Sequence, residues 1–391
     1  MKKTLAAVAV LGAFAGSALA ADVTIYGRID TGFAYTNTEK TNNEGVKTTD
    51  ESAFEMISGG STTSRFGIKG SEEISENLTV GFVLEKGLTI DDGTSSNDTM
   101  FDRESSLWVK TNFGTLYAGR LGSLFSDGGS LAMWGNHVAF GSGTGGSFGA
   151  GYGLLASQSR ASNRIAYVSP TIAGFKVAAE YSMGGGTYGK YEDKVGTEEN
   201  TREYDREAAL GVEYKNGAFG GALVVATIFE DDFYSAKEGG NGVLDHKHGA
   251  DPEDQWTVSL AADYDFGVAK VYVAGQYFKD ANEVGSFEEL GALSGMDELE
   301  GYGFVVGADV PLAGGLLTVG GAYTDGEDKA KNSSLEFSGW NVGAQYKYQL
   351  SKRTRVYATV GYTNLEAEKD SWSDKEEYKY WGGNVGIAHY F

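Results

Sequence analysis

A two-residue alternation of apolar with polar or small residues recurs along this chain from residue 21 to its end. Trp256, Val258 and Leu260, for example, alternate with Thr257 and Ser259. Successive residues of a β-strand point to opposite faces of its sheet, so each such segment predicts a strand with one apolar and one polar or glycine-rich face. No apolar run beyond residue 21 reaches the length of a transmembrane helix, and 3.6-residue periodicity is hard to find. The sequence therefore predicts an all-β chain.

The alternating segments are even in number. There are sixteen of them, at 23–36, 61–74, 78–90, 102–112, 114–123, 161–170, 173–184, 206–216, 218–229, 255–265, 267–278, 301–311, 314–324, 337–349, 352–364 and 379–391. Short links such as Asn216-Gly217 alternate with long acidic connections. An even strand count with alternately short and long connections is typical of antiparallel outer-membrane barrels.

The position of the tyrosines separates two architectures. A soluble sandwich, propeller or solenoid would bury its apolar faces, whereas an outer-membrane barrel turns them to lipid and its polar faces to a wet lumen. Tyr181 and Tyr362 end the apolar face of strands running one way, and Tyr214, Tyr264 and Tyr348 end it for strands running the other way. Tyrosines at both ends are typical of interfacial aromatic girdles. We therefore expect a sixteen-stranded antiparallel transmembrane β-barrel without free sheet edges.

The first twenty residues predict export. Lys2 and Lys3 form a positive n-region, an apolar stretch of 11 residues covers 5–15, and 17–20 ends in the small-x-small pattern that signal peptidase reads. A transmembrane anchor is the alternative, but the apolar stretch is shorter than the roughly 20 residues that a spanning helix needs. We expect residues 1–20 to be a signal peptide and residues 21–391 to form one barrel domain.

The composition argues against several functional classes. The chain has 54 acidic and 32 basic residues, for a formal net charge of −22, whereas a nucleic-acid binder normally carries a basic balance. The lack of cysteine excludes disulfides, thiolate metal sites and cysteine nucleophiles. None of the four histidines lies on a predicted strand beside a plausible Ser and Asp, so we expect no enzyme.

Five segments, in chain order, resemble the general diffusion porins of Gram-negative outer membranes, especially the beta-proteobacterial type. They are VTIYGRIDTGF, SRFGIKGSEEISENLTVGFVLEKG, FDRESSLWVKTNFGTLYAGRLGSLFSD, SNRIAYVSPTIAGFKVAAEYS and the closing NVGIAHYF. The family often has a basic residue where Ala388 stands. The resemblance implies a barrel with an inward-folded third loop, usually a homotrimer, that conducts ions and small hydrophilic solutes passively. A solute-specific outer-membrane channel with a saturable lumen site is the alternative.

The resemblance also implies partners and a location. The terminal Phe391 is the residue that such proteins present to the outer-membrane assembly machinery.

Seven long connections other than the third loop carry 40 acidic and 11 basic residues, which predicts an acidic outer mouth on a mildly basic tube. These acidic loops are open to three interpretations: lipopolysaccharide contact bridged by divalent cations, surface solubility or host contact. We expect no cofactor beyond loose divalent-cation association with the acidic loops.

The resemblance assigns a pore constriction to a ladder of basic wall residues. Carried over position by position, these are Arg28, Arg65, Lys69, Arg103 and Arg160. Alternation independently places the first three on the polar faces of their strands. Arg103 would face lipid by strict alternation from Leu107, unless its strand starts there or bulges; Arg120 and Arg164 are lower-ranked alternatives.

Few carboxylates are available to oppose these arginines. The third loop, residues 124–159, contains only Asp127, and we expect Glu85 on the neighbouring wall to compensate. Arginines facing carboxylates across a narrow waist create a transverse field that orders water and favours polar solutes. The inventory predicts a constriction with more basic than acidic character.

Two further motifs could indicate a phosphate site or a metal site. The glycine-rich segment 141–153 lacks the Lys-Ser/Thr of a phosphate-binding loop, so a pore loop is the better interpretation. His246 and His248, close to Asp245 and Asp251, have the spacing of a metal pair but lie in a long acidic connection. A solvated acidic loop is the simpler interpretation there.

Overall fold

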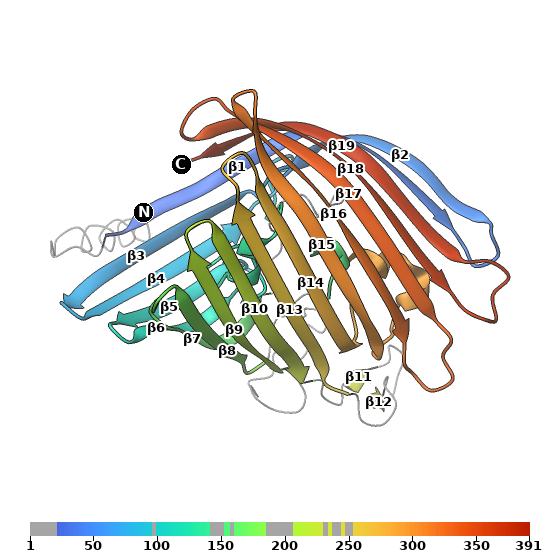
Figure 1. Cartoon of the computed structure of the whole chain (residues 1–391), viewed down its shortest axis with the longest axis horizontal. Coiled ribbons are helices and arrows are strands. Elements are labelled where there is room, and N and C mark those ends of the chain that lie inside the picture. The colour runs from blue at the N-terminus through green and yellow to red at the C-terminus, as the bar shows by residue number, and fades with distance from the viewer. Residues whose placement is uncertain are drawn as a thin grey trace, which may run out of the picture.

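The computed structural model describes residues 22–95, 99–140, 152–156, 160–184, 206–229, 234–236, 244–246 and 253–391. The proposed signal peptide, most of the glycine-rich segment and the histidine motif's side chains lie outside this part of the chain. Figure 1 shows long tilted strands that follow one another around a single barrel.

The barrel wall has sixteen strands when β2 and β3 are counted as one. They are two halves of the same wall strand, separated by residues 59–64. The first half of the chain contributes β1 (Thr24–Thr41), β2 (Lys47–Ser58), β3 (Arg65–Ser75), β4 (Leu78–Gly87), β5 (Glu104–Thr111), β6 (Gly114–Leu121), β7 (Ala161–Val168), β8 (Phe175–Ser182) and β9 (Arg206–Asn216). The second half contributes β10 (Phe219–Phe229), β13 (Gln255–Asp265), β14 (Lys270–Ala281), β15 (Leu299–Leu312), β16 (Gly315–Asp328), β17 (Glu336–Gln349), β18 (Thr354–Glu368) and β19 (Glu376–Tyr390). A separate hairpin, β11 (Tyr234–Ala236) with β12 (Leu244–His246), lies between β10 and β13.

The sheet closes on itself through β1. On one side β1 pairs with β19, from Arg28 opposite Tyr390 to Thr41 opposite Glu377. On its other side β1 pairs first with β3 and then with β2. Every neighbouring pair is antiparallel, and each strand of the wall pairs on both sides except β2, which pairs with β1 alone. Ring closure lets the other wall strands satisfy their backbone hydrogen bonds within the sheet. The predicted sixteen-stranded antiparallel barrel is confirmed.

The connections are short at one end of the barrel and long at the other. Turns of two to six residues, such as 217–218 and 169–174, join the strands at the end where both termini of the barrel lie. Most of the connections at the opposite end are longer, among them 88–103, 122–160 and 282–298. In outer-membrane barrels the long loops are extracellular and the short turns periplasmic.

Aromatic side chains form two rows on the outer face. Near the short turns, Tyr214 lies between Phe175 and Phe219, with ring centroids 4.4 and 6.2 Å away. Near the long loops, Trp340 stacks on Tyr362 at 5.1 Å. Between the two rows the outward positions are apolar and exposed, which is the surface that a lipid bilayer covers.

The first connection differs from the expected one. Residues 37–60 were predicted to be a loop, but β1 continues to Thr41 and β2 starts at Lys47, so most of this stretch is a hairpin. Its turn is closed by Asn42, whose Oδ1 accepts the backbone N–H of Val46 at 2.9 Å. The stacked rings of Phe33 and Phe54, 5.8 Å apart, support the pairing. Local cross-strand pairing therefore extends the ladder beyond the segment that strict alternation marks.

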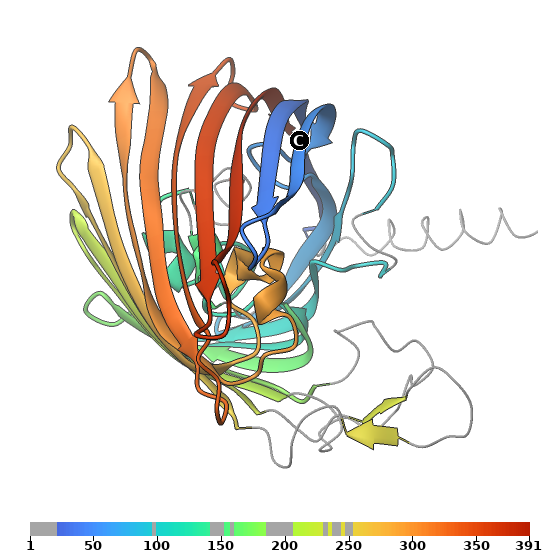
Figure 2. The same ribbon diagram turned by 90° about the vertical axis from the view of Figure 1, so that its right-hand side faces the viewer.

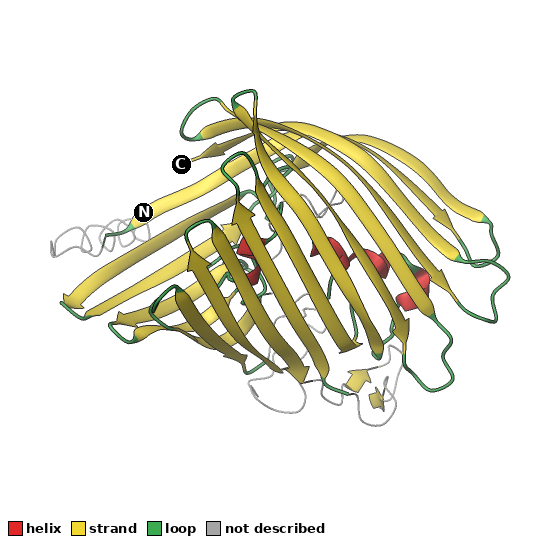
Figure 3. Ribbon diagram, in the orientation of Figure 1, coloured by secondary structure: helices red, strands yellow, loops and turns green. Residues whose placement is uncertain are grey.

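Two long loops fold into the barrel rather than away from it. Loop 3 (residues 122–160) contains the 3₁₀ helices η1 (Trp134–His137) and η2 (Tyr152–Leu154). Loop 6 (residues 282–298) contains η3 (Gly285–Glu289) and η4 (Gly291–Leu293). Figure 2 shows the short helices of these loops within the ring of strands, and Figure 3 marks them in red. No helix among the described residues has the length and hydropathy to span a bilayer.

The largest buried apolar cluster lies between these loops and the inner wall. Among its fully buried members are Trp134, Phe278, Phe287, Leu121, Leu124, Leu154, Leu155, Leu290, Leu299 and Leu335. The packed loops thus cover one side of the inner wall. β1 and β3 to β5 contribute no residue to this cluster.

Candidate functional site

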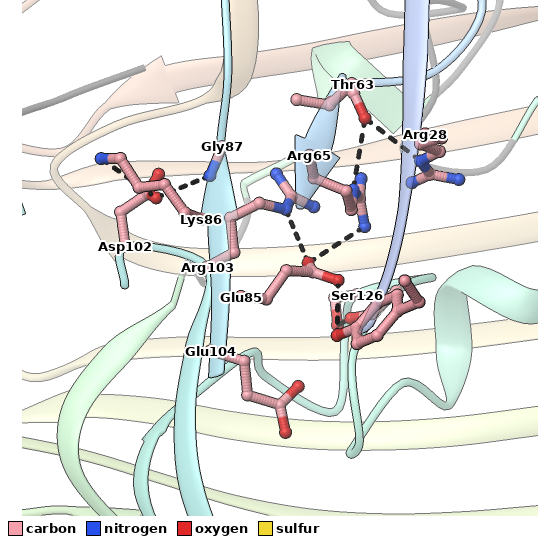
Figure 4. A network of polar contacts seen from close by, with 12 residues as sticks. Arg28, Thr63, Arg65, Glu85, Lys86, Gly87, Asp102, Arg103, Glu104 and Ser126 are labelled. Atoms are coloured by element: carbon pink, nitrogen blue, oxygen red, sulfur yellow. Dashed lines mark hydrogen bonds and ion pairs between the residues drawn. The ribbon is translucent and has the colours of Figure 1, made fainter. Parts of the chain in front are cut away.

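Arginines converge on one carboxylate at the inner wall (Figure 4). Nε of Arg103 lies 2.8 Å from Oε1 of Glu85, and Nη1 of Arg65 lies 3.3 Å from the same oxygen. The second oxygen of Glu85 accepts the hydroxyl of Tyr26 at 3.0 Å. Glu85 of β4 therefore contacts a tyrosine of β1, an arginine of β3 and the arginine that precedes β5.

Strand register brings these residues together. Arg28 of β1 and Arg65 of β3 are direct cross-strand partners, and Gly87 of β4 is opposite Arg65. Glu85 of β4 is paired with Glu104, the first residue of β5. Residues paired across an antiparallel ladder point to the same face, so all of these side chains enter the lumen together.

Arg103 reaches the lumen because β5 begins one residue after it. The alternation of β5 starts at Glu104, and the backbone N–H of Arg103 donates to the carbonyl oxygen of Glu85 at 3.2 Å. Its side chain is thus released from the alternation that would send it to lipid. Of the two possibilities that the sequence left open, the strand start accounts for its position.

The break between β2 and β3, residues 59–64, folds inward and is held by Asp30. The Oδ2 atom of Asp30 accepts the backbone N–H groups of Ser61 and Thr62 at 3.1 and 2.9 Å. Its Oδ1 atom accepts the hydroxyl of Tyr357 at 2.5 Å. Gly60 has no side chain here because an added Cβ would lie 2.3 Å from that hydroxyl oxygen. The buried carboxylate therefore fixes the inward course of this segment.

This break positions two of the arginines. The carbonyl oxygen of Thr63 accepts Nε of Arg28 at 3.1 Å and Nε of Arg65 at 3.2 Å. One backbone group thus holds two guanidinium groups side by side, as Figure 4 shows. Sequence reasoning placed a strand through residues 61–64 and missed both Asp30 and Thr63. The Gly-Gly-Ser-Thr-Thr-Ser run at 59–64 is the signal that could have indicated a break, because glycine and hydroxyl residues favour turns.

The other predicted constriction residues are more dispersed. Arg160, immediately before β7, interacts electrostatically with Arg103 and Glu85. Lys69 is exposed on β3, with its Nζ 5.0 Å from the centroid of the Tyr26 ring. Asp127 lies beside Gly135 within loop 3.

Two lower-ranked arginines have structural partners. Arg164 is fully buried, and its guanidinium contacts Glu207 and lies 3.6 Å from Glu180. Arg120 donates to the carbonyl oxygen of Asp102 at 2.6 Å and to Ser162. The buried and paired charge of Arg164 holds the wall together and is not available to a passing ion.

His137 at the end of η1 fixes loop 3 to the wall. Its Nδ1 contacts Oδ1 of Asp263 on β13, and its Nε2 lies 3.2 Å from Oε1 of Glu213 on β9. Each ring nitrogen therefore faces a carboxylate oxygen from a different strand. Lys176 and Lys270 pair with the outer oxygens of these carboxylates at 2.5 and 3.0 Å. Sequence reasoning did not single out this residue.

The described residues contain no group of three or more His, Cys, Asp or Glu side chains arranged to hold a metal ion.

The comparisons with known proteins agree with this architecture. The family model described as Gram-negative porin matches residues 6–368. The chain belongs to the Gram-negative porin family. The porin is 29% identical to an outer membrane porin protein of Bordetella pertussis and 28% identical to outer membrane porin protein 32 of Delftia acidovorans. Both matches cover 100% of each chain.

Solved structures give the same result. An anion-selective porin from Comamonas acidovorans superposes with a TM-score of 0.64 at 25% identity, covering 95% of this porin and 100% of that chain. The outer membrane channel DcaP of Acinetobacter baumannii has a TM-score of 0.61 at 14% identity, covering 96% and 99%. The porin is therefore a passive channel of the Gram-negative outer membrane for ions and small hydrophilic solutes, and not an enzyme.

Proposed function

We propose that the waist of this porin favours anions, and that Arg28, Arg65, Arg103 and Arg160 supply the positive field. The observation that carries the proposal is the convergence of these side chains on one inner wall: Arg65 and Arg103 share Glu85, and Arg28 and Arg65 share the Thr63 carbonyl oxygen. Arg160 interacts electrostatically with Arg103 and Glu85. The anion-selective porin of Comamonas acidovorans, which shares the fold, supports it. Lys69, exposed towards the short-turn end, continues the basic wall.

The field acts through desolvation and confinement. In bulk water two charges 4 Å apart interact with about 1 kcal/mol, and near a protein surface with about 4 kcal/mol. Arg65 and Arg103 are only 9% exposed, so their charges act in a confined space. Carboxylates temper this effect without cancelling it, because Glu85 contacts two guanidinium groups and Glu104 is hydrogen-bonded to Ser130 and Ser106. Asp127 would contribute only a peripheral negative charge.

Several further properties are part of the proposal. Residues 1–20 direct export, the mature chain begins at residue 21, and the porin assembles as a homotrimer. A porin-like barrel from Vibrio cholerae, 18% identical, has been solved in a trimer form. Phe391 closes the barrel against Gly27 through two backbone hydrogen bonds of 3.1 Å and would present its carboxyl-terminal signal to the assembly machinery. The acidic loops would contact lipopolysaccharide through divalent cations.

Planar-bilayer recording tests the proposed anion preference. In a KCl gradient, the reversal potential should shift toward the Nernst potential of chloride. In symmetrical KCl, conductance should rise with the salt concentration without saturating. A reversal potential on the potassium side contradicts the proposal. Competitive block by one sugar, amino acid or dicarboxylate would instead indicate a solute-specific channel.

A further inference from the structure

Loop 6 crosses the extracellular mouth instead of lying above its own hairpin. It leaves β14 and returns to β15, but its helices η3 and η4 contact residues of β17, β19 and β1. Figure 2 shows η3 and η4, in orange, inside the ring of strands. The loop therefore occupies space that would otherwise belong to the channel.

Its underside is anchored by apolar packing. Phe287, Leu290 and Leu293 are buried in the apolar cluster of the inner wall. The ring of Phe287 meets that of Phe337 edge-on at 5.0 Å and lies over Gly339, where an added Cβ would be 2.8 Å from the ring. Removing large apolar side chains from water is favourable, so these three hold the loop inside the barrel.

Polar contacts fasten the far end of the loop. The carboxylate of Glu376, on the lumen face of β19, accepts the backbone N–H groups of Gly291 at 2.8 Å and Ala292 at 2.9 Å. Lys40 of β1 lies 2.9 Å from Oε2 of Glu289 and donates to the Glu289 carbonyl oxygen at 3.3 Å. Charge-assisted hydrogen bonds of this kind are about twice as strong as neutral ones. Glu376 lies four strands and Lys40 five strands from β15, the nearer of the two strands that bear the loop.

Loop 6 also rests on loop 3. The hydroxyl of Ser286 donates to the carbonyl oxygen of Gly153 at 3.1 Å, and Val284 is buried in the same apolar cluster as Leu154. Thr324 of β16 donates to the Leu154 carbonyl oxygen at 2.8 Å, which ties the pair to the wall. The two loops thus form one packed layer along the inner face.

We propose that loop 6 forms a second, fixed constriction above the arginine waist, and that it sets the size limit for solutes entering from the extracellular side. Glu376 is its positioning residue. Glu283, Glu288 and Glu289 are exposed on the loop, so the outer constriction is acidic and lies in series with the basic waist. A solute must pass both, and the outer one selects mainly by width. The inference rests on an open channel, which the conductance of the wild-type porin tests separately.

The test is polymer exclusion in planar bilayers, with neutral polyethylene glycols of graded size added to one side at a time. Small polymers enter a vestibule and lower its conductance, whereas excluded polymers do not. In Glu376→Ala the loop loses its clamp, so larger polymers should reduce conductance when added from the long-loop side. Their exclusion limit from the short-turn side should stay at the wild-type value.

A control and a second variant complete the design. Glu377→Ala removes a carboxylate from the opposite face of the same strand, where Glu377 pairs with Lys379 at 2.6 Å, and should leave both exclusion limits unchanged. Phe287→Ala removes the apolar anchor without changing any charge and should shift the long-loop limit as Glu376→Ala does. An unchanged long-loop limit in both variants, or an equal shift from both sides, would overturn the inference.

Discussion

Nε of Arg103 lies 2.8 Å from Oε1 of Glu85, so the waist carries its main counter-charge on the same wall as its arginines. The family resemblance placed that counter-charge on loop 3, where 124–159 offers only Asp127. With the carboxylate beside the guanidinium groups, the field across the lumen is one-sided. In the proposed function, this asymmetry is what makes the waist favour anions.

Removing Asp30 should loosen the waist although Asp30 itself is buried. Asp30→Ala leaves the N–H groups of Ser61 and Thr62 and the hydroxyl of Tyr357 without their acceptor. Since hydrogen bonds to charged groups contribute about 1.5–3 kcal/mol each, we expect a loss of roughly 3 kcal/mol or more in the free energy of unfolding. Denaturant unfolding of the barrel in detergent measures this loss. Asp91→Ala, at an exposed loop position, is the control and should change it by less than about 0.5 kcal/mol.

The same substitution should increase the noise of the open-channel current. Without its inward course, the segment 59–64 no longer presents the Thr63 carbonyl oxygen to Arg28 and Arg65. Single-channel recordings of Asp30→Ala should show more open-state noise than the wild type. A quiet channel with the wild-type conductance would separate Asp30 from the arginine waist.

His137→Gln should free the tip of loop 3. Glutamine cannot reach Asp263 and Glu213 along both ring directions, so the two carboxylates lose their shared partner. Because the chain has no cysteine, a single spin label can be placed at the exposed Asn136. The label should become more mobile in His137→Gln. His389→Gln, a histidine at the short-turn rim that bonds Thr354, should leave the spectrum as it is.

Salt should change selectivity in a defined direction. The screening length falls from about 30 Å at 0.01 M to about 10 Å at 0.1 M, so salt screens the exposed acidic mouth before the confined waist. Anion preference should therefore increase over this range, since the cation-attracting mouth is weakened first. Reversal potentials at a fixed gradient ratio measure it. Permeability ratios that do not change with ionic strength would rule out two zones of opposite charge.

Much of the barrel follows from local alternation. Trp256 to Tyr264 form the strand that their pattern predicts. Wherever a strand crosses the bilayer, an apolar outer face is favoured because it contacts lipid. The same reasoning identified Arg28, Arg65 and Lys69 as inward-facing. Alternation cannot locate strand starts, so it cannot decide which way the Arg103 side chain points. The start of β5 at Glu104 decides it.

The inner layer could not be predicted in this way. The contacts of Glu376 with Gly291 and Ala292, or of His137 with Asp263, join segments that are 84 or more residues apart. Phe287 and Leu290 belong to an acidic connection with no periodic pattern, and their burial depends on the closed barrel around them. Such tertiary contacts leave no signal in a local window.

The most direct test of the basic waist is the reversal potential of the double variant Arg65→Ala with Arg103→Ala, measured against the wild-type porin in the same KCl gradient. Arg353→Ala, which removes one positive charge from an exposed turn, is the control and should change the potential little in 1 M salt, where the screening length is about 3 Å. We predict that the double variant moves the reversal potential toward that of potassium. A reversal potential equal to the wild-type value would contradict the assignment of Arg65 and Arg103 to the waist.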